Sequence, residues 1–405
     1  IRVTDACEQC GHCTAVCTSN VIVHAEVKQY GMVVDPGCMK CMDCISVCPT
    51  NALYYGFGKP AFALPKATKA KTVTRHYSLT WPEEIASLLI FLGSFLGVRA
   101  AYGLVPFLMA LGVASVTTFL ALKAWRLFTT REVYLHRFIL KSAGAWKKAG
   151  LVFVLFALAW IALNAHTAFI HYQENAGDKA FQSLRLPDEL ALAQTDPRPF
   201  LSPADRTAVA SGTAHYQNAE KFGFFQNSDA LAKLAWFEFL SGHAPRAVDL
   251  LGRAAAGQKG EAKALSLYYR GALQSRLGQF RDALVNLDAA LAERPDLILA
   301  RQEKGEALWR LGEKTQAIDI WQDAIRRNPN LILTNDQLAS AYRLLGQSAA
   351  ADAAEAAADS ATPNDPLYHL MLALRLRNVG MLDLAQKHFQ QANALDPRLR
   401  NLGSQ

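Results

Sequence analysis

The chain has 405 residues, which is more than one ordinary domain needs. Apolar residues make up 51% of it, a high share for a soluble protein. The net charge of +7 is divided unevenly, with −2 over residues 1–58, +10 over residues 59–171 and −1 over the remainder. Because the basic excess lies in the most apolar part, it favours a membrane segment with positive flanks over a nucleic-acid binder.

Residues 1–58 contain two copies of one cysteine motif with the spacing C-x2-C-x2-C-x3-C, the second followed by Pro49. All eight cysteines of the chain lie in these copies: Cys7, Cys10, Cys13, Cys17, Cys38, Cys41, Cys44 and Cys48. Structural zinc uses pairs of C-x2-C knuckles, which give the third cysteine no role. Disulfides are the other alternative, but cysteines this close in sequence make poor partners for one another. The spacing therefore favours iron–sulfur clusters.

This spacing resembles that of two-cluster bacterial ferredoxins. The resemblance implies a small α+β ferredoxin-like domain that binds two [4Fe–4S] clusters, each taking its fourth ligand from the other motif. It assigns Cys7, Cys10, Cys13 and Cys48 to cluster I, and Cys38, Cys41, Cys44 and Cys17 to cluster II. Thr18 follows Cys17 where the family has proline, so that turn is less constrained. The apolar runs 21–23 and 32–34 are expected to pair as short strands.

A basic linker at 59–80 precedes an expected membrane domain at 81–171. Its three apolar helices, at about 83–101, 104–124 and 149–170, approach the length of about 20 residues that a span needs. A buried soluble hairpin is the alternative, although apolar helices this long seldom lack a polar face. The basic segment 125–148 has interleaved apolar residues and is expected to form a helix in the membrane interface.

Three spans would place the two ends of the chain on opposite sides of the membrane. Because the linker and the segment 125–148 are both basic and fall on one side, that side should be the cytoplasm of a bacterial inner membrane. The C-terminal part would then be periplasmic. His166 and His171 lie near the outer end of the third span, where they could ligate haem or contact a quinone. No facing helix offers a second histidine, since His76 and His136 fall on the cytoplasmic side.

A proline-containing linker is expected at 172–205, followed by a helical domain at 206–405 with a period of 34 residues. Small residues and prolines recur at this period: Gly278, Gly312, Gly346 and Gly380; Ala283, Ala317, Ala351 and Ala385; Ala290, Ala324, Ala358 and Ala392; Pro295, Pro329, Pro363 and Pro397. The pattern closely resembles the tetratricopeptide repeat over about residues 230–400. The resemblance implies an all-α solenoid with a concave face that binds a protein partner. Residues 206–230 would be a degenerate repeat or a cap.

Together these parts indicate a multidomain protein: a membrane-anchored iron–sulfur electron-transfer subunit of a respiratory or redox complex. It would relay single electrons to or from a partner subunit or a quinone, while the repeats dock a periplasmic protein. The layout is similar to that of the membrane-bound ferredoxin-type proteins of periplasmic reductases. The eight cysteines and the general order of the parts are the only features that carry this resemblance. The sequence holds no nucleotide-binding glycine loop or nucleophile motif, which favours a subunit over a complete enzyme.

Two other functions remain open at this stage. An assembly or maturation factor would use the clusters to supply electrons to a client held by the repeats. A redox sensor would need an output domain, and none is recognisable in the sequence.

Overall fold

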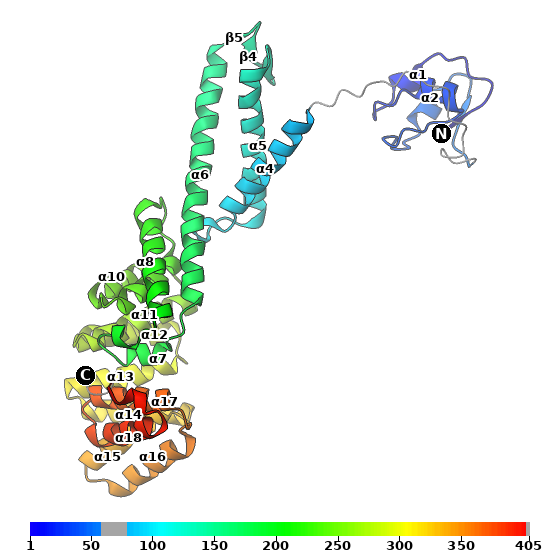
Figure 1. The fold of residues 1–405 in the computed structure, drawn as a ribbon. Coiled ribbons are helices and arrows are strands. Elements are labelled where there is room, and N and C mark those ends of the chain that lie inside the picture. The colour runs from blue at the N-terminus through cyan, green and yellow to red at the C-terminus, as the bar shows by residue number, and fades with distance from the viewer. Residues whose placement is uncertain (58–78, 402–405) are drawn as a thin grey trace. The chain divides into compact units, whose positions relative to one another are not determined.

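The structure is a computed structural model that describes residues 1–57 and 79–401 (Figure 1). The chain divides into two compact units, Ile1–Leu79 and Thr80–Gln405, which are described separately below. Most of the expected basic linker, including His76, lies outside the described residues.

The first unit is a small α+β domain, as expected. Its elements are β1 (Arg2–Val3), α1 (His12–Ala15), α2 (Val23–Tyr30), α3 (Asp43–Ser46) and β2 (Leu53–Tyr54). The strands β1 and β2 pair antiparallel and join the two ends of the domain. The core is small: Val21, Val23, Val27 and Leu53 pack with the thiols Cys13 and Cys44. A domain with so few apolar side chains depends on other interactions for stability.

The expected pairing of residues 21–23 with 32–34 is wrong. Val23 begins α2, and Met32 forms an isolated bridge with Arg2 instead. Glu26 explains part of this difference, because its carboxylate accepts hydrogen bonds from the Val34 and Asp35 N–H groups at 2.9 and 3.1 Å. These bonds tie the chain after α2 to the helix itself.

The second unit begins with long apolar helices: α4 (Trp81–Val98), α5 (Phe107–Thr129) and α6 (Lys148–Gln182), with the short η2 (Ala101–Gly103) between the first two. By length and composition, each of the three long helices can cross a membrane. They pack on one another, and a Cβ at Gly97 would lie 2.6 Å from the Cβ of Ala168, so glycine permits α4 and α6 to approach closely. Large apolar side chains remain exposed along them, among them Leu89, Leu96, Leu108, Leu155 and Phe156.

The expected interfacial helix at 125–148 is wrong. α5 continues to Thr129, and the rest forms an antiparallel sheet of β3 (Val133–Leu135), β4 (Phe138–Ser142) and β5 (Ala145–Trp146). Ala143 and Gly144 join β4 to β5 with φ of 49° and 81°, and positive φ at both loop residues is typical of the tight turns in hairpins. The Lys141 ammonium donates to the Leu127 carbonyl oxygen at 2.8 Å, which fastens the sheet to the end of α5.

Residues 172–205 also differ from the expected linker. α6 extends to Gln182 and packs against α8 (Pro203–Phe222), so one continuous helix joins the apolar bundle to the repeats (Figure 1). Gly177 makes this packing possible, because a Cβ there would lie 2.8 Å from the Tyr216 ring. Residues 183–202, between α6 and α8, hold α7 (Asp188–Leu192) and η3 (Arg198–Phe200).

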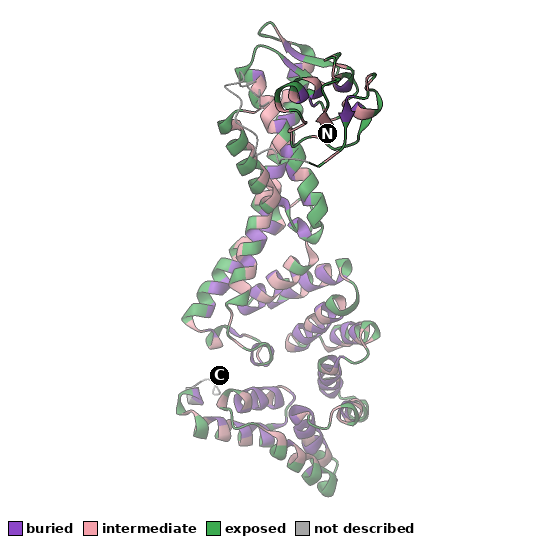
Figure 2. Ribbon diagram, turned by 90° about the vertical axis from the view of Figure 1, so that its right-hand side faces the viewer, coloured by how far each residue is buried: buried purple, intermediate pink, exposed green. Residues whose placement is uncertain are grey.

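The 34-residue period is confirmed as a series of helix pairs. These are α9 (Ser228–Leu240) with α10 (Ala244–Gly257), α11 (Gly260–Arg276) with α12 (Phe280–Glu293), α13 (Ile298–Leu311) with α14 (Lys314–Arg327), α15 (Ile332–Leu344) with α16 (Ser348–Ala361), and α17 (Pro366–Asn378) with α18 (Leu382–Leu395), followed by η4 (Pro397–Asn401). The recurring glycines turn the chain between the helices of a pair, with φ of 76° at Gly278 and 87° at Gly312. Figure 2 shows buried residues throughout the stack. The first helices α13, α15 and α17 are buried on nearly all sides, whereas the second helices α12, α14, α16 and α18 each expose one side.

Candidate functional site

The two cysteine motifs adopt the same backbone conformation. Gln9 and Lys40, which precede the second cysteine of each motif, have φ of 60° and 56°. Gly11 and Met42, which follow it, have φ of 83° and 69°. Left-handed residues between right-handed ones turn successive N–H groups toward one side, a concave arrangement that also surrounds iron–sulfur clusters. Each motif therefore forms a preshaped loop around its cysteines.

The hydrogen bonds of the two motifs repeat as well. The Cys17 and Cys48 N–H groups donate to the Thr14 and Ile45 carbonyl oxygens, each at 3.2 Å. Their own carbonyl oxygens then accept from Asn20 and Asn51, at 3.2 and 3.1 Å. The third cysteine of each motif thus lies on α1 or α3, and the fourth is held by hydrogen bonds two residues after that helix ends.

The eight thiols differ in burial, and Cys7, Cys17, Cys38 and Cys48 are half-buried. Cys13 and Cys44 are buried on α1 and α3, which pack against each other, whereas Cys10 and Cys41 are exposed. Burial, followed by the nearby Cys38 and Cys41 sulfurs, raises the pKa of Cys44, and the Cys13 sulfur of the other motif adds to this effect. Repulsion among gathered thiolates is relieved when iron binds them.

The Cys48 sulfur has hydrogen-bond donors around it. The Ala52 N–H donates to it at 3.3 Å, and the Thr50 hydroxyl lies 3.8 Å away. Although burial acts to raise it, hydrogen bonds from this turn leave the pKa of Cys48 below its usual value. The turn that precedes β2 therefore stabilises the thiolate form, which is the form that binds iron.

These observations fit [4Fe–4S] clusters. All eight cysteines are free thiols, and they lie on two equivalent loops joined by α1, α3 and the β1–β2 sheet. Among the described residues, no three His, Cys, Asp or Glu side chains lie close enough to bind a single metal ion. Four thiolates that each bind a different iron of a cluster stand farther apart than four ligands of one ion. How the eight cysteines divide between two clusters stays a prediction.

Two of the histidines considered for a second cofactor lie within hydrogen-bond distance of nearby groups. His166 Nε2 lies 3.0 Å from the Phe222 carbonyl oxygen, and His171 Nε2 lies 2.9 Å from the Asn175 amide nitrogen. His136 is exposed in the turn between β3 and β4. The structure does not bring these three histidines together, so it gives no support for a haem held by two of them.

A second candidate site is the inner surface of the helix pairs, which the sequence did not show to be occupied. Residues 183–202, here called the strap, run across the first helices of the pairs. Leu190, Ala191, Leu192 and Ala193 of the strap are each at most 4% exposed. Ala191 and Leu192 pack into the apolar core of α9–α12, and Leu190 and Ala193 pack into that of α13–α18. The strap therefore joins the two halves of the repeat core.

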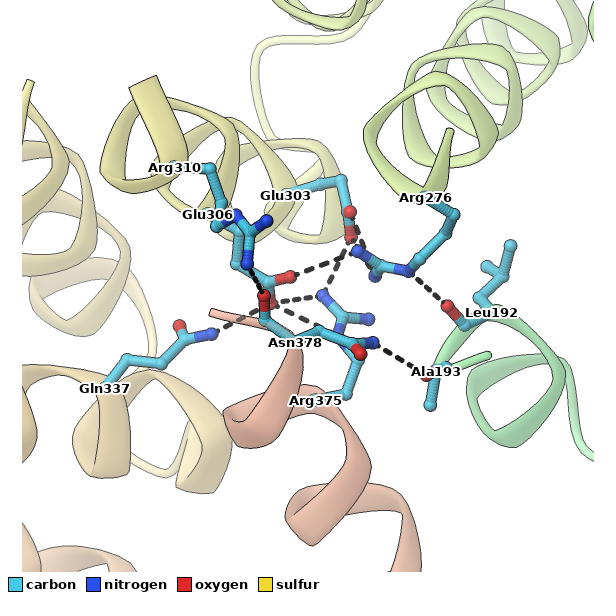
Figure 3. Close-up of polar contacts among 9 residues, drawn as sticks. All are labelled: Leu192, Ala193, Arg276, Glu303, Glu306, Arg310, Gln337, Arg375 and Asn378. Atoms are coloured by element: carbon cyan, nitrogen blue, oxygen red, sulfur yellow. Dashed lines mark hydrogen bonds and ion pairs between the residues drawn. The ribbon is translucent and has the colours of Figure 1, made fainter. Parts of the chain in front are cut away.

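Polar contacts hold the strap along its length (Figure 3). The Arg276 guanidinium donates to the Leu192 carbonyl oxygen at 2.5 Å, and the Asn378 amide donates to that of Ala193 at 2.8 Å. The Tyr269 hydroxyl donates to Asp188 at 3.0 Å, and burial raises the pKa of that carboxyl. Buried carbonyl oxygens of an irregular segment need such donors to remain stable.

Next to the strap lies a group of four buried charges, here called the charge cluster: Arg276 on α11, Glu303 and Glu306 on α13, and Arg375 on α17 (Figure 3). The Glu303 carboxylate lies 3.0 Å from Arg276 and 2.7 Å from Arg375. Arg375 Nε donates to Glu306 at 3.1 Å. The two positive and two negative charges balance, and they link three repeats across the inner surface.

Two of the cavities that border the strap lie over different helix pairs. One of about 290 Å³ is lined by Trp236, Tyr269 and Phe181, and is mainly apolar. The other, of about 400 Å³, lies between the strap and α13, α15 and α17, with Arg375 and Gln302 in its wall. Both cavities have residues of the strap in their walls.

Comparison with known proteins gives one family match. Residues 6–53 match the model of the 4Fe-4S dicluster domain. No curated protein matches the chain. Solved structures similar to it include MamA, at 19% identity over 40% of this chain and 95% of that one, with a TM-score of 0.36. Another is TTC0263, a thermophilic TPR protein in Thermus thermophilus, at 24% identity over 43% of this chain and 94% of that one, with a TM-score of 0.35. The N-terminal unit therefore carries a 4Fe–4S dicluster domain, and a stack of helical repeats follows in the second unit.

Proposed function

We propose that this protein is a membrane-anchored electron-transfer subunit of a respiratory or redox complex. The observation that carries the proposal is the pair of equivalent cysteine loops in a domain of the 4Fe–4S dicluster family. Each [4Fe–4S] cluster, when bound, accepts and releases one electron at a time. The chain's own residues supply the thiolates and shape the loops, and the exposed Cys10 and Cys41 lie at the surface where a partner would dock.

We assign the ligands in a crossed pattern: Cys7, Cys10, Cys13 and Cys48 for cluster I, and Cys38, Cys41, Cys44 and Cys17 for cluster II. The contact between α1 and α3 supports it, because it brings the two motifs into one core. In this arrangement neither motif completes a cluster alone, so metal binding also holds the domain together.

The proposed topology has three membrane spans, α4, α5 and α6, in a bacterial inner membrane. The dicluster domain lies in the cytoplasm and the repeats lie in the periplasm. The charge of the connecting segments supports this orientation. The β3–β5 segment and the adjoining helix ends are strongly basic, whereas the chain after α6 is close to neutral.

The repeats then dock a periplasmic partner protein, and electrons leave the dicluster domain through another subunit or a quinone. Stacked helix pairs present large surfaces, and their common use is contact with other proteins. The strap occupies much of the inner surface, so the convex side and the cavities that border the strap are the surfaces left for such a partner.

Purification of the full chain from its native membrane in mild detergent tests this function. A stable complex of fixed stoichiometry, with redox cofactors in the partner subunits, supports it. A Cys44→Ser variant should assemble with the same subunits but lose electron flow through the complex, whereas Ser46→Ala, on the same short helix, should keep both. Transient association with a client that lacks its cofactor would instead identify an assembly factor.

The topology has its own test. Protease added outside intact spheroplasts should remove the repeats and spare the dicluster domain, and inverted vesicles should show the reverse. If the outside protease removes the dicluster domain, the proposed orientation is wrong.

A further inference from the structure

A short loop between α8 and α9 exposes three aromatic side chains. Phe222, Phe224 and Phe225, here called the aromatic loop, are 47%, 64% and 63% exposed. The helix pairs that follow bury Phe237, Phe239 and Trp321 and keep their other aromatic side chains at least half-buried. Three exposed phenylalanines within four residues form an apolar patch of the kind that marks an interaction site.

The turn between α4 and α5 and the helix α6 hold the aromatic loop at a defined height. The Phe224 N–H donates to the Tyr102 hydroxyl at 3.3 Å, and Tyr102 lies in the turn between α4 and α5. The Phe222 carbonyl oxygen lies 3.0 Å from His166 Nε2 on α6. The Tyr102 and Phe225 rings meet edge to face, with centroids 5.6 Å apart. Figure 1 shows this end of α8 beside α6, near the turn that follows α4.

That height coincides with the expected edge of a bilayer. The hydrocarbon core is about 30 Å thick, or about 20 helical residues at about 1.5 Å each. Counted from Lys148 at the start of α6, the core ends close to His166 and Ala168. The turn at Tyr102 must lie at the same boundary, because it connects two spans. The aromatic loop is therefore fixed beside the headgroup region on the repeat side.

The chemistry of the loop suits this position. Phenylalanine rings partition into the region between headgroups and acyl chains. The Lys221 ammonium lies 5.2 Å from the Phe222 ring centroid, where it can reach lipid phosphates. The exposed apolar surface of the helices, such as Phe169 on α6, continues directly into the loop, since the Phe169 and Phe222 rings are 6.3 Å apart.

We propose that the aromatic loop inserts into the lipid leaflet on the repeat side and fastens the repeats against the membrane surface. The inference rests on the proposed spans, because without them the loop has no bilayer beside it. It adds a second membrane contact, made by the repeat domain itself, to the anchor formed by the three helices.

Photo-crosslinking in proteoliposomes tests the inference with the full chain. The photoreactive residue p-benzoylphenylalanine replaces Phe224, Phe156 or Leu344 in turn, in vesicles that contain radiolabelled phosphatidylcholine. Phe156 is 55% exposed, lies near the middle of the proposed span of α6, and reports whether the helix contacts lipid. Leu344 is 67% exposed on α15 and serves as the control for an exposed apolar position within the repeats.

The expected result is lipid labelling at positions 224 and 156, with background labelling at 344. Labelling at 156 without labelling at 224 would overturn the inference while leaving the spans intact. Absence of labelling at both 156 and 224 would refute the membrane topology, and the inference with it. Labelling of 224 and 344 alike would show nonspecific contact and would also reject the proposal.

Discussion

The charge cluster gives a sharp test of how the repeats are held together. Its four side chains are almost fully buried, with exposures of 0% for Glu303, 2% for Glu306, 6% for Arg276 and 7% for Arg375. Arg375→Met keeps most of the side chain's volume but leaves one uncompensated negative charge among these groups. Breaking a buried ion pair on one side costs about 3–5 kcal/mol, a large fraction of the stability of a domain.

The assay is denaturant unfolding of the full chain, followed by tryptophan fluorescence. Trp309 is a suitable reporter, because its indole N–H donates to the Val379 carbonyl oxygen at 3.1 Å, close to Arg375 in sequence. The matched control is Arg398→Met, which removes an exposed ion pair with Asp396 and should leave the midpoint unchanged. A second change, Glu306→Gln, restores the charge balance of the Arg375→Met variant and should recover part of the lost stability.

The pH dependence of this deficit provides a second readout. Burial raises the pKa of Glu303 above its ordinary value of 4.5, and Arg375 is one of the groups that oppose this rise. Without Arg375 the charged carboxylate penalises the folded state, so the deficit of the variant should be largest near neutral pH. It should shrink as the pH falls toward 4.5, because the protonated carboxyl carries no charge. A deficit below about 1 kcal/mol, or one that does not respond to Glu306→Gln, would refute the reasoning.

Three further predictions follow from the site and the repeats. The intact chain should contain about eight iron and eight sulfide ions per molecule. Electron paramagnetic resonance should show that Cys48→Ser damages the cluster of the first motif and that Cys17→Ser damages the cluster of the second. Damage to the opposite clusters would reject the crossed assignment. Burial lowers the pKa of His369 from 6.5, and His388 lies 3.0 Å from it, so the free energy of unfolding should fall as the pH drops below 6.5. The His369→Gln variant should lose this pH dependence of stability, and an unchanged dependence would contradict the prediction. Leu192→Ala, at a strap position only 1% exposed, should cost about 2–5 kcal/mol and expose the strap to limited proteolysis; an unaltered cleavage pattern would show that the strap does not depend on this side chain.

Signals with a fixed spacing were read correctly from the sequence. The 34-residue glycine period matches the turns seen at Gly278 and Gly312, because a left-handed backbone there requires glycine in every copy. Gly305 on α13 has a packing reason of its own, since a Cβ there would collide with the Trp321 indole on α14. The eight-cysteine spacing predicted the iron–sulfur family that residues 6–53 match.

Features that depend on distant partners were missed. The strap was expected to be a linker because of its prolines, yet its carbonyl oxygens are bound by Arg276 and Asn378, 84 and 185 residues from their partners in the chain. The segment 125–148 mixes basic and apolar residues in a way that fits a helix or a short hairpin, and the Ala143–Gly144 turn decided between them. Arg375 was a readable signal, because it ends the apolar run Leu370–Leu374 of its helix, but its partners on α13 could not be inferred from it.

The continuity of α6 has a mechanical consequence. A helix advances about 1.5 Å and rotates about 100° with each residue, so its 35 residues fix both the height and the azimuth of whatever they carry. The face of α6 that contacts α4 at Ala168 and the face that contacts Tyr216 at Gly177 are therefore held at a fixed angle to each other around the helix axis. A protein bound to the repeats would therefore be held in one orientation relative to the three apolar helices.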